Sequence, residues 1–235
     1  MRALRLQPRR ALAVYAHPDD ADVAAGGMLA QWAHDGADVA LVVVCDGSKG
    51  SHGHSVDGPA LATRRRGEVD RAAEILGLTE VVRLGVPDGE VDNDLSLRSH
   101  LVRVVREHRP EVVVGPDPTA VFFGGVYVNH RDHRETGWAL LDAVAPAAGM
   151  PLYFPDAGPP HQVGRLLLSG TQEPDVVVDI SRTIQSKTAA VLAHASQLGT
   201  EDGEIREIVA VRAEQAGRPV GVAYGEAFRS VELTW

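Results

Sequence analysis

Residues 11–20 read Ala-Leu-Ala-Val-Tyr-Ala-His-Pro-Asp-Asp, and this stretch carries the signals of a strand, a turn and a helix start. Its apolar first part indicates a buried strand. Pro18 and Asp19 are typical of a helix start and Gly36 of a helix end, so the sequence predicts a helix over residues 19–35. The turn between the two elements therefore carries an imidazole and two carboxylates.

The rest of the chain repeats this alternation. Residues 39–45 (VALVVVC) form a nearly continuous β-branched run, as expected of a strand covered on both faces. Further strands are predicted at 81–84, 112–115, 165–169 and 176–180, and further helices at 61–76, 95–108, 129–145, 181–197 and 201–217. The pattern predicts an α/β fold with a Rossmann-like, doubly wound, mostly parallel sheet and helices on both faces. Because no linker divides the chain, we expect one domain over residues 1–235.

Composition narrows the classes of function. The net charge of −9 disfavours a general nucleic-acid or anionic-membrane binder. The single cysteine excludes an intrachain disulfide and fits a reducing compartment. The apolar run before His17 is short for a signal-peptide core and far short of a membrane span. We therefore expect a cytoplasmic protein with no membrane insertion and no nucleic-acid partner.

Polar residues gather where the first four strands end, in the motifs HPDD, DGSKGSHGH, PDG and GPDP. Ligands of open α/β sheets bind at the carboxyl ends of the strands. A second polar group, His130-Arg131-Asp132-His133, opens a predicted helix and places two imidazoles on one helix face. In the loop after the second strand, His52 and His54 are more typical of an exposed loop than of a substrate contact.

These residue types fit a metal site. Imidazole and carboxylate are good ligands for zinc, although the same set also accepts Fe²⁺ or another divalent ion. His17, Asp20 and one of the two later histidines would make three ligands, which leaves a fourth position open for water, as in catalytic zinc sites. Taken singly, an aspartate at a helix start is more typical of a cap, and a His-x-x-His pair of a solvated helix face.

The motifs together resemble those of the LmbE-like (PIG-L) metal-dependent N-acetylglucosaminyl deacetylases. The resemblance runs in the same order along nearly the whole chain, and HPDD with His-x-Asp-His is its most specific pair. The matching stretches are His17–Asp20, Gly26-Gly27, Asp46–Gly50, Arg65-x-x-Glu68, Pro87-Asp88-Gly89, His130-x-Asp132-His133 and His194-x-Ser196-Gln197.

The resemblance implies a zinc-dependent hydrolase that removes the N-acetyl, or another N-acyl, group from a glucosaminyl conjugate. It implies that His17, Asp20 and His133 bind zinc and that Asp19 is the general base for the attacking water. His130, held by Asp132, would stabilise the oxyanion or protonate the leaving amine.

The resemblance also indicates residues that bind the substrate. Arg65 and Asp88 match positions that contact the sugar in some relatives. Tyr127 corresponds to a loop tyrosine at a different offset, and His194 lies in a motif near the site. Asp88 is equally typical of a plain turn in Pro-Asp-Gly.

Two alternative functions also fit the sequence. One is an amidase that acts on a larger, non-acetyl amide conjugate. The other is a non-catalytic sugar- or nucleotide-binding α/β module. Relatives often form trimers or hexamers, so a homo-oligomer is an expectation of the resemblance.

Overall fold

The computed structural model describes residues 1–51, 56–198 and 202–234. A mixed sheet runs through the molecule in the strand order β1-β9-β10-β8-β5-β2-β3-β4. Its strands are β1 (Arg2–Ala3), β2 (Arg10–Tyr15), β3 (Asp38–Cys45), β4 (Glu80–Val86), β5 (Val112–Pro116), β8 (Arg165–Ser169), β9 (Val176–Asp179) and β10 (Gly225–Glu232).

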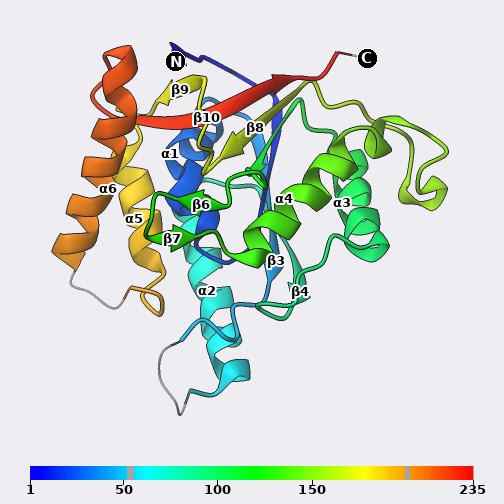
Figure 1. Cartoon of the computed structure of the whole chain (residues 1–235), viewed down its shortest axis with the longest axis horizontal. Helices are drawn as coiled ribbons and strands as arrows, with labels where there is room; N and C mark the ends of the chain where they lie inside the picture. Colours follow the sequence, from blue (N-terminus) through cyan, green and yellow to red (C-terminus); the bar gives the residue numbers. More distant parts are fainter. Residues whose placement is uncertain (52–55, 199–201, 235) are drawn as a thin grey trace.

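Helices cover both faces of this sheet (Figure 1). They are α1 (Asp20–His34), α2 (Gly58–Leu76), α3 (Leu95–His108), α4 (Arg131–Val144), α5 (Ile184–Ala193) and α6 (Asp202–Gly217). Helices α1, α2 and α5 pack together on one face, and α3 packs with α4 on the other. The predicted α/β class with a mostly parallel sheet is confirmed. Among the described residues, no helix is long and apolar enough to cross a lipid bilayer.

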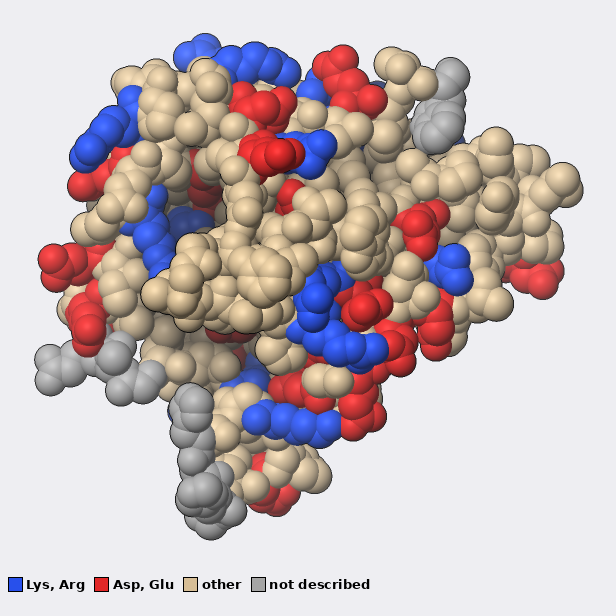
Figure 2. Space-filling model, in the orientation of Figure 1, with Lys and Arg blue, Asp and Glu red and all other residues tan. Residues whose placement is uncertain are grey.

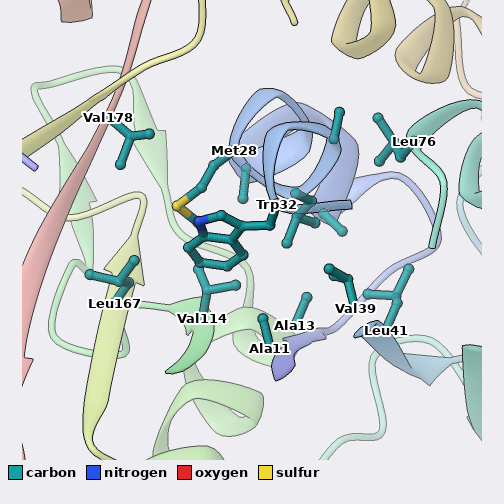
Figure 3. Close-up of a cluster of buried hydrophobic side chains, with 14 of the residues drawn as sticks. Ala11, Ala13, Met28, Trp32, Val39, Leu41, Leu76, Val114, Leu167 and Val178 are labelled. Atoms are coloured by element: carbon teal, nitrogen blue, oxygen red, sulfur yellow. The ribbon is translucent and has the colours of Figure 1, made fainter. Parts of the chain in front are cut away.

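Strand β2 separates two apolar cores because its successive side chains point to opposite faces. Ala11, Ala13 and Tyr15 enter the core beneath α1, whereas Leu12 and Val14 enter the core beneath α3 and α4. In the first core the Trp32 side chain, only 2% exposed, lies over the sheet among small and branched side chains (Figure 3). Alanines on β2 leave the space that this indole fills.

Helix α1 approaches its neighbours closely at Gly27. A Cβ there would lie 2.7 Å from Ile180 Cδ1, closer than real atoms pack. The amides of Gly27 and Met28 donate to the carboxylate of Glu226, at 2.9 and 2.8 Å. Lys187 Nζ donates to the same carboxylate at 2.5 Å, so α1, α5 and β10 are joined by one buried ion pair.

Several features, among them the short strand β1, differ from the sequence-based expectation. Strand β10 was not expected; it lies antiparallel between β8 and β9, so the sheet is mixed at that side. The loop before α4 contains a short hairpin, β6 (Phe122–Phe123) and β7 (Tyr127–Val128). Helix α5 ends at Ala193 rather than at Gln197, because His194 turns inward and Glu68 accepts hydrogen bonds from the amide and hydroxyl of Ser196.

Candidate metal centre and active site

The predicted site residues converge at the carboxyl ends of β2, β3 and β4, beside the start of α4. A cavity of about 460 Å³ opens there. Eight of the ten predicted residues line it, namely His17, Asp19, Asp20, Arg65, Asp88, Tyr127, His130 and His133. Asp132 and His194 are fully buried behind its walls.

Three potential ligand atoms meet at one point of this cavity. His17 Nδ1 lies 3.0 Å from His133 Nε2 and 3.4 Å from Asp20 Oδ2. Asp20 Oδ1 lies 3.1 Å from His133 Nε2. Two imidazole nitrogens and a carboxylate so close together are a donor set suited to a divalent cation, and they leave one side open to the cavity.

The charges of Asp20 and His17 depend strongly on their surroundings. Burial alone would raise the pKa of Asp20, but His133 and His17 lower it well below its usual range. Burial likewise opposes the charged form of His17, yet its hydrogen bond and charge interaction with Asp20 raise the pKa of His17 to about 9. The cluster is thus arranged to place a positive charge beside the Asp20 carboxylate.

Both candidate histidine ligands are held through their second ring nitrogens. His17 Nε2 lies 3.2 Å from Asp132 Oδ2, and His133 Nδ1 lies 3.0 Å from Asn129 Oδ1. Such outer partners fix the ring orientation and tautomer of metal-bound histidines. The residues therefore fit a metal by the arrangement of their neighbours as well as by the donor atoms. Sequence reasoning missed Asn129, although its place four residues before His133 at a helix start was a usable signal.

Asp132 holds a different histidine from the one expected. Its Oδ2 is 3.6 Å from His130 Nδ1 but 3.2 Å from His17 Nε2. The amides of Gly89 and Val91 donate to its two oxygens, at 2.6 and 3.3 Å, and fix the buried carboxylate beneath His17.

Asp19 lies at the start of α1 but does not cap it, because its side chain makes no capping hydrogen bond. Burial raises the pKa of the Asp19 carboxyl, and the neighbouring Asp20 charge raises it further. A carboxylate with a raised pKa, lining the cavity beside the three ligand atoms, is suited to accept a proton.

His130 is the cap of α4. Its Nδ1 accepts from the Asp132 amide at 3.2 Å, which leaves Nε2 as the protonated nitrogen of the neutral ring. Burial lowers the pKa of His130, and the charge of His17 lowers it further. A neutral, half-exposed imidazole with one N–H donor therefore stands at the cavity wall.

Arg65 and Asp88 line the cavity, yet both are tied to the loop that follows β3. Arg65 donates to the carbonyls of Gly47 and Gly50, at 2.5 Å each. Asp88 accepts from the amides of Gly47 and Lys49, at 3.0 Å each. Arg65 and Asp88 thus fix the loop after β3, which forms one wall of the cavity.

The remaining predicted residues differ in position. Tyr127 lies on the hairpin, half exposed, with its ring 5.8 Å from that of Phe123. His194 is wholly buried, and its Nε2 lies 2.7 Å from Asp22 Oδ2. It supports the start of α1 from behind and does not face the cavity. His52 and His54 lie outside the described residues.

At the carboxyl edge of this open α/β sheet, a His-Asp-His cluster lies beside a carboxylate and an imidazole donor. This arrangement is typical of a metal-dependent hydrolase. The sequence matches the family described as GlcNAc-PI de-N-acetylase (PIG-L) over residues 12–144. The chain belongs to this family, whose deacetylases are metal-dependent, and the predicted family and class of enzyme are confirmed.

Individual relatives extend this likeness beyond the matched segment. The chain is 33% identical to a diacetylchitobiose deacetylase of Thermococcus kodakarensis, over 95% of this chain and 83% of that one. It is 28% identical to a 1D-myo-inositol 2-acetamido-2-deoxy-α-D-glucopyranoside deacetylase of Streptomyces avermitilis, over 96% and 82%.

Solved structures agree on the fold. The N,N'-diacetylchitobiose deacetylase of Pyrococcus horikoshii superposes with a TM-score of 0.86 at 28% identity, over 96% of this chain and 84% of that one. The 4-carboxy-2-hydroxymuconate hydratase GalB of Pseudomonas putida has a TM-score of 0.78 at 26% identity, over 97% and 98%. Because this fold also carries a hydratase, the particular reaction must be argued from the site.

Proposed function

We propose that the chain hydrolyses the N-acetyl, or another N-acyl, group of a small glucosaminyl conjugate in the 460 Å³ cavity. The observation that supports this proposal is the convergence of His17, Asp20 and His133 next to Asp19, whose carboxylate makes no capping hydrogen bond. The relatives named for deacetylation of N-acetylated sugars support the choice of substrate class.

His17, Asp20 and His133 would hold the metal, which we propose is zinc. When bound, zinc polarises a carbonyl and lowers the pKa of water from about 16 to about 7. Asp132 and Asn129 keep the two imidazoles in the orientation that such binding requires.

Asp19 would take a proton from the attacking water and return it to the nitrogen of the breaking C–N bond. Its raised pKa suits both steps, because the carboxylate is a stronger base and the acid formed is still able to release its proton. The products are a carboxylic acid and a free amine, so atoms and protons balance.

His130 would donate its Nε2 hydrogen to the oxyanion that forms on the former carbonyl oxygen. Its lowered pKa and the use of Nδ1 as an acceptor keep it neutral with that hydrogen in place. Between the two expected roles of His130, the structure supports oxyanion stabilisation, an effect of roughly 3 kcal/mol in comparable sites.

A matched set of metal-depleted and zinc-reconstituted protein tests the proposal with N-acetylglucosaminyl and long-acyl glucosaminyl substrates. Amine release should appear only after reconstitution and should favour the acetyl substrates. A preference for long acyl groups would support the amidase alternative. Equal activity without metal would contradict the proposal, and tight sugar binding without turnover would support a binding module.

We propose the cytoplasm as the compartment, because the single cysteine, Cys45, is a buried free thiol. The expected trimer or hexamer stays a prediction, which sedimentation of the purified chain would test.

A further inference from the structure

A second cavity, of about 470 Å³, opens on the other side of the metal-ligand cluster. Asp19, Asp20, His133 and Tyr127 belong to the walls of both cavities. The cluster therefore stands between two chambers. A substrate whose amide lies at the cluster can extend into the second chamber as well as the first.

An acetyl group does not account for a chamber of this size. One water molecule already takes about 30 Å³ of liquid volume, and an acetyl group has only three heavy atoms. The second chamber therefore has room for a much larger part of the substrate.

Val23, Ala24, Pro116 and Phe123 form an apolar part of the wall of the second chamber, and the carboxylates of Asp19, Asp20 and Asp117 also line this chamber. The surface over the hairpin that carries Phe123 shows no acidic or basic side chain (Figure 2). This apolar part of the wall favours a carbon skeleton over a fully hydrated group.

Most polar side chains of the second chamber already have partners. Tyr15 donates its hydroxyl hydrogen to Ser169 Oγ at 2.9 Å, and Ser169 donates to the Gly115 carbonyl. Asp117 accepts from the amide and hydroxyl of Thr119 with one oxygen. Tyr15, Ser169 and one oxygen of Asp117 are therefore committed to contacts within the fold.

Arg212, an exposed residue of α6, differs from these groups. It reaches the wall of the second chamber from α6, and within the described residues it makes no hydrogen bond or ion pair. A guanidinium is always charged and only donates hydrogen bonds, so its natural partner is an anion. Arg212 also lies outside residues 12–144, which match the family.

We propose that the second chamber binds a carboxylate or phosphate that the substrate carries on an apolar linker, and that Arg212 selects it. This inference rests on the proposed function, and it makes the C-terminal helix α6 a determinant of specificity. The anionic group can belong either to the aglycone or to the acyl chain.

Two pairs of substrates distinguish these sources. The first pair is carboxyphenyl N-acetylglucosaminide and its methyl ester, and the second is N-succinylglucosamine and its methyl ester. In one pair, the free acid should have a kcat/KM about 10- to 100-fold above that of the ester, as for a hydrogen bond to a charged group. The pair that shows the preference identifies the source.

Arg212→Gln should abolish this preference by lowering the kcat/KM of the free acid to that of its ester. Arg206→Gln is the matched control, because Arg206 is exposed on the same helix and lines neither chamber. The inference is overturned if wild type turns over acid and ester equally in both pairs. It is also overturned if Arg212→Gln slows acid and ester to the same extent. Failure to release amine from all four compounds would instead refute the proposed function, and this inference with it.

Discussion

Asp132 Oδ2 lies 3.2 Å from His17 Nε2, although the two residues are 115 positions apart in the sequence. This contact joins the turn after β2 to the first turn of α4. It leaves His17 Nδ1 free to point at Asp20 and His133. The carboxylate of Asp132 thus orients His17, and it does so from helix α4, which also carries His133.

Asp132→Asn should weaken zinc binding about 10- to 100-fold, the usual cost of removing such an outer partner. The physical reason is that the asparagine amide, unlike the carboxylate, neither fixes the tautomer of His17 nor raises the basicity of its ring. Zinc titration against a competing chelator measures the change. Glu135→Gln, on the same helix, is the control and should bind zinc like wild type; unchanged affinity in Asp132→Asn would contradict this role.

Arg65→Met should destabilise the protein by about 1–3 kcal/mol or more, because it leaves the carbonyls of Gly47 and Gly50 without their buried donor. Urea unfolding measures this loss. Arg66→Met, the neighbouring exposed position, should have little effect. If Arg65→Met raised KM and left stability unchanged, Arg65 would be a substrate contact and not a support of the loop.

Glu226→Gln should cost roughly 3–5 kcal/mol of unfolding free energy, because it leaves the Lys187 ammonium buried without its counter-charge. The comparison is Glu173→Gln, which breaks an exposed pair with Arg229 and should cost about 0–1 kcal/mol. Equal effects of the two substitutions in urea unfolding would refute the difference in burial as the cause.

His194→Gln tests a pH effect on stability. Burial opposes the charged form of His194, but its hydrogen bond and charge interaction with Asp22 raise its pKa above the usual 6.5 overall. A raised native pKa means that the native state binds more protons than the unfolded state. The resulting stabilisation is complete below pH 6.5 and is lost as the pH rises through the native pKa.

Metal-free wild type should therefore keep its full stability advantage over His194→Gln below pH 6.5 and lose that advantage as the pH rises above this value. Unfolding in urea at several pH values gives the two profiles. Parallel profiles would show that His194 does not gain protons on folding.

The turn after β2 was predictable because its signals are local. An apolar run, a proline and two aspartates specify strand, helix start and carboxylates without any distant contact. The same holds for β3, where a run of β-branched residues indicates a strand covered on both faces. These elements bring the HPDD motif to the sheet edge.

Other features depend on contacts that a sequence does not display. Residues 225–232 mix glycine, charged and apolar residues, and they form β10 because β8 and β9 leave a space between them. His194 has an ordinary helical setting, yet Asp22 draws it inward and ends α5 early. The choice of Asp132 between two nearby histidines likewise depends on the amides of Gly89 and Val91.

In the proposed mechanism, Asp19 acts as the base beside a metal held by other residues. Asp19→Asn, purified beside wild type and Asp35→Asn, tests it by measuring metal content and amine release on the same samples. We predict that Asp19→Asn retains about one metal per chain and loses about 10²- to 10⁴-fold in kcat, with Asp35→Asn unchanged. Wild-type turnover in Asp19→Asn, or loss of its metal, would contradict the claim.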